Sequence, residues 1–408
     1  MTFPTSTADQ RPLNVLLALP MDAERGGVVS VVANLARRLQ DDGHNVLIFH
    51  PFGSVMLKHR LTQLGFAGVQ LRLTMPFGRG IRGLLRTVVS PFLFVSSLLQ
   101  LLWFLRSHHV HVVNLHYVID NFVYFAICRR LLAIRLVMSV HGRDAFYRDQ
   151  PLEKYSRAFK FLASASDLVV LPSDAYRRKF LQAFPHLEER TIFIHNGIDP
   201  CRFNAPAQVN HGLNRYILCI AELQEYKAID ILLRAAQQLL TDDDSLTLVL
   251  AGDGPLRRDL ESLSSSLGIR HRTMFLGTQG ASEIVTLLRG CEVMVLPSRM
   301  EPFGIVLIEA MACKAPVVAT NVGGIPEIIQ HEVTGILVEP ENPGALSAAI
   351  RRVLTDADLR KELVENGYSR VMDRFYAARN ATAYVDAFVS VLPAGAVTSR
   401  ARSAGVTN

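Results

Sequence analysis

The segment of clearest chemical meaning contains two glutamates, Glu301 and Glu309, eight positions apart. An apolar strand pattern precedes Glu301, and Pro302 is typical of the first position of a helix, where its missing N–H costs nothing. Glu309 follows Pro302 by seven residues, about two helical turns, so we expect it on nearly the same face as the helix entrance. Carboxylates placed in this way can flank one ligand, and they suit the hydroxyls of a sugar or ribose, not phosphates.

The same helix start predicts an anion site between the two glutamates. The amides of Phe303, Gly304 and Ile305 have no partner within a helix that begins here, and the helix dipole adds positive potential. Gly304 lets a ligand approach the backbone closely. We therefore expect a diphosphate on these amides. The alternative is that Glu301 is a surface residue and Glu309 an ordinary helix-face charge.

Three further sites lie where strand patterns turn into helical ones. Gly26 and Gly27 form a turn whose amides can approach a phosphate or sugar, although a tight structural turn is an alternative. His141 ends a strand pattern and is either a sugar contact or a structural histidine. Lys227 precedes a helical pattern and can neutralise a diphosphate leaving group, whereas a lone lysine is ordinarily solvated.

Alternating strand and helix patterns position these residues. In the first half, apolar strand patterns occupy residues 13–19, 45–50, 111–116, 135–141, 167–173 and 191–196. In the second half they occupy residues 216–222, 246–252, 274–277, 293–298, 316–320 and 335–340. Helical patterns separate them, which predicts an α/β protein with two doubly wound parallel sheets that bind ligands at the carboxyl ends of the strands.

The chain length also predicts two domains, because 408 residues exceed what one core usually serves. Residues 196–214 are rich in Gly, Pro and Asn and read as a linker. We expect a first domain over 12–200 and a second over 201–367, facing each other across a cleft. A helix over 368–392 is expected to cross back to the first domain, and 393–408 to be a disordered tail.

Composition favours a cytoplasmic globular protein. Hydrophobic residues make up 49% of the chain, and the N-terminus lacks the basic and apolar regions of a secretory signal. The five cysteines are scattered, without a C-x-x-C pair, which argues against a disulfide framework and a zinc site.

Charge is distributed unevenly along the chain. Residues 1–200 carry 23 Lys and Arg against 14 Asp and Glu, or +9, and the remainder carries 20 against 23, or −3. A basic first half can attract an anionic membrane or a phosphate-bearing substrate, or it can be a solvated basic face. Nucleic-acid binding is disfavoured because no recognition motif is present.

Residues 88–106 form an apolar run close to the length needed to span a membrane. Pro91 and polar residues interrupt it, and a spanning helix would break the strand–helix alternation. We therefore expect a buried crossover helix. The alternative is a surface-seeking helix that meets anionic lipid at the inner face of the cell membrane.

Residues 13 to 391 resemble the family-4 retaining glycosyltransferases, a GT-B group. The resemblance rests on the E-x7-E motif EPFGIVLIE together with APVVAT, GGIPEI, GDGP at 252–255, HNGID at 195–199, GG at 26–27 and HG at 141–142. It implies that residues 12–200 form the acceptor-binding domain and residues 201–367 the nucleotide-sugar-binding domain. It also implies that Glu309 holds the donor ribose and that Glu301 lies by the donor sugar. It further implies that Lys227 binds the diphosphate, and that no metal or other cofactor takes part.

Two positions depart from the family pattern. Glu222 stands where the family commonly has a phosphate-binding arginine, and Arg25, Arg143 and Arg299 are candidates to replace it. Lys314 stands where glycine is frequent, near the end of a helix.

The resemblance implies a hexosyltransferase-type enzyme. We expect it to transfer sugar from a nucleoside-diphosphate sugar to a glycan, lipid-linked or small-molecule acceptor in bacterial polysaccharide or glycoconjugate biosynthesis. The acceptor residues are unknown. Two alternatives stay open: a catalytically impaired nucleotide-sugar-binding protein, motivated by Glu222, and a nucleotide-sugar epimerase on the same fold.

Overall fold

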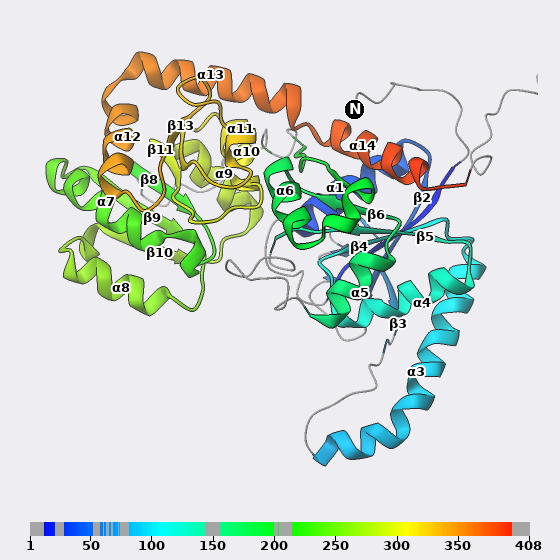
Figure 1. The fold of residues 1–408 in the computed structure, drawn as a ribbon. Coiled ribbons are helices and arrows are strands. Elements are labelled where there is room, and N and C mark those ends of the chain that lie inside the picture. Colours follow the sequence, from blue (N-terminus) through cyan, green and yellow to red (C-terminus); the bar gives the residue numbers. More distant parts are fainter. Residues whose placement is uncertain are drawn as a thin grey trace, which may run out of the picture. The chain divides into compact units, whose positions relative to one another are not determined.

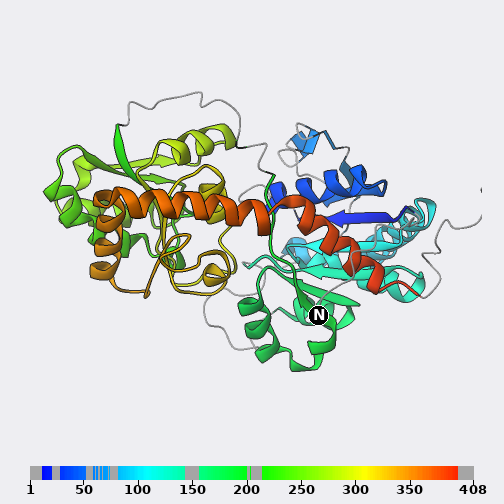
Figure 2. The same ribbon diagram turned by 90° about the horizontal axis from the view of Figure 1, so that it is seen from above.

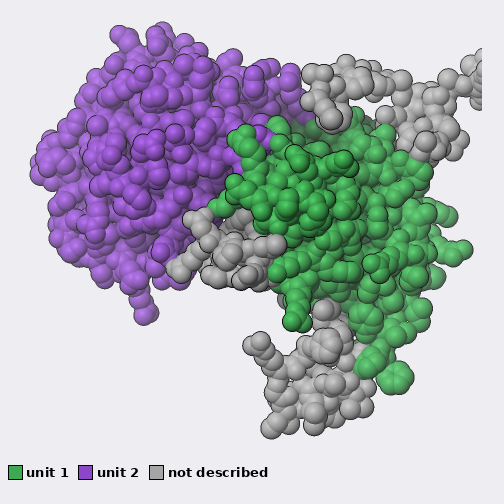
Figure 3. All heavy atoms as spheres, in the orientation of Figure 1, with its two compact units in different colours: residues 1–171, 177–194, 380–408 green, residues 172–176, 195–379 purple. Residues whose placement is uncertain are grey.

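The computed structural model describes residues 12–20, 28–51, 81–142, 156–199 and 214–393, together with Phe203 and short pieces between 58 and 73. The chain divides into two compact units (Figure 3). Unit 1 holds residues 1–171, 177–194 and 380–408, and unit 2 holds residues 172–176 and 195–379. The C-terminal segment returns to unit 1, as predicted for the last helix. The chain also crosses at 171/172, 176/177 and 194/195, where the sequence predicted one boundary at 200/201.

Unit 1 contains a parallel sheet in the order β3-β2-β1-β4-β5-β6-β7 (Figure 1). Its strands are β1 (Asn14–Ala18), β2 (Asn45–Pro51), β3 (Gly68–Leu71), β4 (Val112–His116), β5 (Arg135–Ser139), β6 (Leu168–Leu171) and β7 (Thr191–Phe193). Its helices are α1 (Val28–Asp41), α3 (Ile81–Ser107), α4 (Val123–Leu131), α5 (Arg157–Ala165), α6 (Asp174–Ala183), whose first turn belongs to unit 2, and α14 (Ala377–Ser390). Five strands lie within the predicted patterns, and β2 extends one residue beyond its own. The edge strand β3 was not predicted because its sequence, GVQL, is not an apolar run and only Leu71 is buried.

Unit 2 contains a second parallel sheet in the order β10-β9-β8-β11-β12-β13. Its strands are β8 (Arg215–Ile220), β9 (Leu246–Ala251), β10 (Thr273–Gly277), β11 (Val293–Leu296), β12 (Val317–Thr320) and β13 (Ile336–Val338). Its helices are α7 (Ile229–Asp242), α8 (Arg257–Ser266), α9 (Ala281–Gly290), α10 (Ile305–Ala312), α11 (Ile325–Ile328), α12 (Pro343–Thr355) and α13 (Ala357–Arg374).

Both faces of the unit 2 sheet are buried, which explains why its strands read as continuous apolar runs. Successive residues of β8 point to opposite faces: Ile217 packs with α7 and α12, and Leu218 packs with α9 and α10. The unit is therefore a three-layer sandwich of helices, sheet and helices. The two Rossmann-like sheets confirm the predicted α/β fold.

The C-terminal part of the described chain consists of two helices. α13 ends at Arg374 in unit 2, and the backbone of Phe375 and Ala377 then pairs with Ile198 through hydrogen bonds of 2.9 and 2.8 Å. α14 follows and contributes Tyr384 and Phe388 to the core of unit 1, on the face covered by α1 (Figure 2). Residues 394–408, nearly all of the predicted tail, lie outside the described residues.

Helix α3 covers the sheet on the opposite side from α14 and extends beyond it (Figure 1). Leu101, Phe104 and Leu105 are buried, whereas Phe92 and Trp103 are exposed. The expectation of a buried crossover helix is therefore wrong for one side of α3, because the helix packs on unit 1 through its other side only. Among the helices that the structure describes, none is long and apolar enough to cross a membrane.

Candidate functional site

The candidate site of unit 2 is built on the loop between β11 and α10. β11 ends at Leu296, and the loop carries Glu301 at the carboxyl end of the sheet. Glu301 is only 7% exposed. The expectation of a surface glutamate is thereby excluded, and a buried carboxylate requires a partner.

That partner is Lys227, which lies 74 positions away in the sequence. Its Nζ is 2.5 Å from a carboxylate oxygen of Glu301. Burial on its own would lower the pKa of Lys227, but Glu301 and the ring of Tyr226 outweigh it and hold the pKa above its usual value. Lys227 is therefore protonated at neutral pH, and the structure brings together two of the predicted site residues.

Arg299 fixes the two loops that carry this pair. Its guanidinium binds both carboxylate oxygens of Asp230 at 2.9 and 2.8 Å, and its amide donates to the carbonyl of Tyr226 at 2.8 Å. Arg299, one of the three candidates to replace the family arginine, thus has its guanidinium on Asp230. Arg25 and Arg143, the other two candidates, lie outside the described residues.

Helix α10 begins at Ile305, three residues later than expected. Gly304 is its N-cap with φ 106°, a left-handed conformation that favours glycine, and no side chain caps the helix. Pro302 therefore lies in the loop and is not the first helical residue, which corrects the sequence-based expectation. Since the first amides of a helix have no partner within it, the predicted anion site moves toward Ile305 and Val306.

The other predicted residues of this segment have different environments. The side chain of Phe303 is buried and stacks on His195, with ring centroids 5.5 Å apart. Only its backbone can face a ligand. Glu309 is partly buried in the second turn of α10, a position from which it can accept hydrogen bonds from hydroxyls.

Two glycines of the GGIPEI motif pack closely against the backbone of Glu301 and Pro302. A Cβ on Gly323 would lie 2.0 Å from the carbonyl oxygen of Glu301, and one on Gly324 would lie 2.5 Å from that of Pro302. The amide of Gly324 donates to the Glu301 carbonyl at 3.0 Å. The motif is therefore explained by close backbone packing.

Glu222 lies in the loop after β8, beside the GDGP segment. Its carboxylate accepts a hydrogen bond from the side chain of Gln224 at 3.1 Å. A Cβ on Gly252 would lie 1.9 Å from the carbonyl oxygen of Ala221, so the two loops are in direct contact. Glu222 and Lys227 both lie in the segment between β8 and α7.

His141 lies after β5 at the carboxyl end of the unit 1 sheet, next to a second histidine. Nε2 of His141 is 2.9 Å from Nδ1 of His116, the last residue of β4. Burial lowers the pKa of His141 to about 4 and, with the neighbouring His141, holds that of His116 well below its usual value. Both rings are therefore neutral at pH 7, and one of them donates its N–H to the acceptor nitrogen of the other. His141 was selected because it ends a strand pattern. His116 also ends one and was missed.

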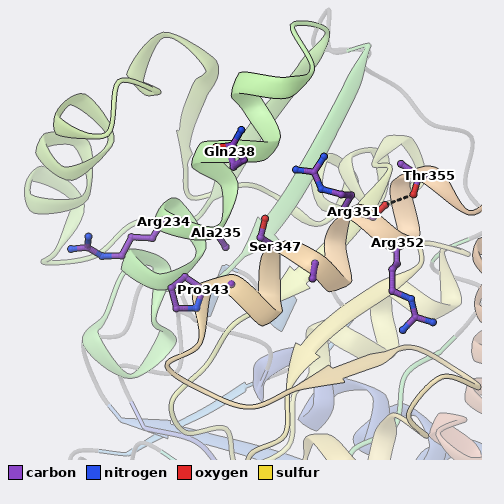
Figure 4. Close-up of a pocket in the computed structure, with 10 residues that line it drawn as sticks. Arg234, Ala235, Gln238, Pro343, Ser347, Arg351, Arg352 and Thr355 are labelled. Atoms are coloured by element: carbon purple, nitrogen blue, oxygen red, sulfur yellow. Dashed lines mark hydrogen bonds between the residues drawn. The ribbon is translucent and has the colours of Figure 1, made fainter.

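The remaining predictions have other outcomes. Gly26 and Gly27 lie outside the described residues. No cluster of His, Cys, Asp and Glu able to hold a metal ion occurs among the residues that the structure describes. A groove of about 650 Å³ between α7 and α12, lined by Arg234, Gln238 and Arg351, contains none of the predicted site residues (Figure 4).

Comparison with known proteins places the chain in a family. Residues 25–202 match the profile described as Glycosyltransferase Family 4, and residues 203–370 match that described as Glycosyl transferases group 1. An uncharacterized glycosyltransferase of Methanocaldococcus jannaschii is 33% identical over 284 residues, which cover 65% of this chain and 70% of that protein. The chain belongs to the family-4 glycosyltransferases. It is therefore a glycosyltransferase of the group 1 type.

Two further relatives extend the family comparison. The D-inositol 3-phosphate glycosyltransferase of Geodermatophilus obscurus is 30% identical over 69% of this chain and 67% of its own length. The crystal structure of Anabaena HepE in complex with UDP and glucose superposes with a TM-score of 0.75 at 22% identity, over 93% of this chain and 100% of HepE. The superposition with HepE shows that the present chain has the GT-B fold.

Proposed function

We propose that the protein is a retaining, metal-independent hexosyltransferase that uses a nucleoside-diphosphate sugar. The observation that carries this proposal is the buried Lys227–Glu301 pair beside the start of α10. As the bond between the sugar and the diphosphate breaks, negative charge accumulates on the diphosphate. Lys227 and the first amides of α10 supply positive charge for it, so the reaction has no need of a metal ion.

The roles of the carboxylates follow from what they can accept. Glu309 holds the ribose hydroxyls of the donor, and Glu301 lies by the donor sugar while it orients Lys227. HepE binds UDP, which supports a nucleoside diphosphate as the leaving group in a relative of the same fold. We propose a glycan or lipid-linked acceptor bound by unit 1, in polysaccharide or glycoconjugate biosynthesis at the inner face of the cell membrane.

Donor binding and transfer test this function separately. Thermal unfolding is measured with UDP-, GDP- and ADP-sugars without metal, because a ligand of the native state raises its melting temperature. We expect one nucleotide series to raise the melting temperature, and Glu309→Gln to remove that rise while the ligand-free melting temperature stays unchanged. A donor-dependent rise that persists in Glu309→Gln would exclude the ribose role.

Transfer is then measured with and without a chelator. Because Lys227 and the helix amides balance the diphosphate charge, we expect EDTA to leave turnover unchanged and the product to keep the anomeric configuration of the donor. Activity that EDTA abolishes and Mg²⁺ restores would contradict the metal-independent reaction, and an inverted product would contradict retention.

A further inference from the structure

Helix α3 presents a line of exposed apolar side chains on one side. The exposed fractions along this line are 78% for Phe92, 51% for Val95, 60% for Leu99 and 70% for Trp103. These residues are three or four positions apart, so they share one face of the helix. Arg106, one turn beyond Trp103, is exposed as well. We call Phe92, Val95, Leu99, Trp103 and Arg106 the outer face of α3.

The opposite side of α3 attaches the helix to unit 1. Ser97, Leu101 and Leu105 are buried there, and the ring of Phe94 stacks on that of Tyr124 with centroids 4.7 Å apart. The outer face is thus not the core side of an ordinary amphipathic helix. It is a second apolar side, held in place by a packed first one.

The outer face is also hollowed. Pro91, Phe92, Val95, Ser96 and Leu99 line an open groove of about 470 Å³. A contiguous exposed apolar surface of this kind is typical of a site that contacts a membrane or a partner.

The charge of the surrounding sequence distinguishes between these occupants. Residues 43–119 contain no Asp or Glu, and they contain seven Lys and Arg, including Arg82 and Arg86 within α3. Two copies of the chain joined through the outer face would bring two such basic segments together. An anionic lipid surface instead supplies the opposite charge, and tryptophan is favoured at the boundary between lipid and water.

We propose that the outer face of α3 inserts into the interfacial layer of a membrane that contains anionic phospholipid. Phe92, Val95, Leu99 and Trp103 enter the boundary between head groups and acyl chains, and Arg106 meets the head groups. The inference concerns a surface of unit 1 and does not depend on the stereochemistry or the donor of the transfer reaction.

Trp103 makes the test direct, because it is the single tryptophan of the chain. Its fluorescence is recorded while the protein is titrated with phosphatidylcholine vesicles, with and without phosphatidylglycerol. We expect a blue shift and quenching by bromine-labelled lipid with the anionic vesicles, both weakened by salt.

The variant Phe92→Gln combined with Leu99→Gln removes apolar area but keeps the reporter. Because both side chains are exposed, the melting temperature is expected to stay the same, and partitioning into anionic vesicles is expected to fall roughly tenfold or more. Met274→Gln, a change at an exposed apolar residue of unit 2, is the matched control and is expected to leave partitioning unchanged.

Three results would overturn the proposal. They are the absence of a blue shift with anionic vesicles, partitioning that the double variant leaves unchanged, and a dimer in light scattering that the double variant dissociates. The last result would show that the outer face joins two copies of the chain. Each readout is independent of sugar transfer, so an inactive protein that binds vesicles would refute the proposed function and not this surface.

Discussion

Glu222 is the single residue whose charge is most at odds with the proposed reaction. Where the resemblance to the family predicts an arginine for phosphate, the chain has a carboxylate in the loop that also carries Lys227. The side chain of Gln224 donates a hydrogen bond to this carboxylate. A donor diphosphate therefore meets one anion more, and one cation fewer, than the family pattern provides.

The variant Glu222→Arg is expected to bind the nucleotide donor more tightly. Replacing an anion near the diphosphate by a cation removes a repulsion and adds an attraction, which we expect to lower Kd by roughly tenfold, about 1.4 kcal/mol. Isothermal titration with the donor measures the change. Glu222→Gln is the matched control and is expected to give an intermediate Kd; weaker binding by Glu222→Arg would show that the carboxylate contacts the donor favourably.

The paired histidines of unit 1 predict an acid-sensitive stability. The pKa of His141 is lowered from 6.5 to about 4 by burial, so between these values the unfolded chain binds more protons than the folded one. Stability is then fully present above pH 6.5 and is lost as pH falls toward 4, by about 3 kcal/mol for His141 alone. Burial lowers the pKa of His116 in the same direction.

Thermal unfolding between pH 7 and pH 4 checks this expectation. His141→Gln is expected to flatten the decrease in melting temperature, because a glutamine does not titrate. The exposed His186, also in unit 1, is the control, and His186→Gln is expected to leave the pH dependence as it is. Equal pH dependence in wild type and His141→Gln would contradict the assignment.

At the scale of elements, the start of α10 decides which backbone amides are free for the proposed anion site. Gly304 adopts φ 106°, and a Cβ there would lie 3.0 Å from a methyl carbon of Leu307. The backbone conformation, more than the space around it, therefore requires glycine. It turns the chain so that the helix begins at Ile305 directly beside the loop of Glu301.

The variant Gly304→Ala is expected to lower both stability and donor affinity. The left-handed conformation costs an alanine about 1–2 kcal/mol, and relief of that strain would shift the first amides of α10 away from the phosphate. Gly268 is a matched control because it also has positive φ and has no atom within 4 Å of a Cβ. Gly268→Ala is expected to lower stability alone. If Gly304→Ala binds donor like the wild type, these amides do not hold the phosphate.

At the scale of the whole molecule, unit 1 depends on the C-terminal part of the chain. α14 contributes Ala381, Tyr384, Ala387 and Phe388 to the core cluster that also contains residues of β1 and α1. The hydroxyl of Tyr384 donates to Ser139 at 3.3 Å, at the end of β5. These two residues are 245 positions apart, so a helix from the C-terminal part of the chain completes the core of the first sheet.

A chain that ends at residue 376 is therefore expected to lose the folded state of unit 1. Exposing the face that α14 covers is expected to lower the free energy of unfolding of unit 1 by on the order of 5 kcal/mol. This loss is comparable with the total stability of a domain. Calorimetry should show the unfolding transition of unit 2 alone. The control is a chain that ends at residue 393, which keeps α14 and is expected to unfold like the full chain; two transitions in the shorter chain would contradict the prediction.

The sequence by itself determined the two parallel sheets, and it selected the segment in which we propose the donor site. Continuous apolar runs such as residues 293–298 predict buried parallel strands because both faces of such a strand exclude water. Glu301, Gly304 and Glu309 could be selected because their types and spacing at a strand-to-helix loop are those of hydroxyl and phosphate recognition. The family resemblance rested on the same segment, and the comparisons confirm it.

Only the tertiary structure decided which residues are neighbours. The Lys227–Glu301 and Arg299–Asp230 pairs join residues 74 and 69 positions apart, and periodicity carries no information on such contacts. The helix start moved from Pro302 to Ile305 because the positive φ of Gly304 depends on the loop that packs against Gly323 and Gly324. The outer face of α3 was predicted as buried because an apolar run shows that side chains avoid water, whereas the folded chain decides how many of them it can cover.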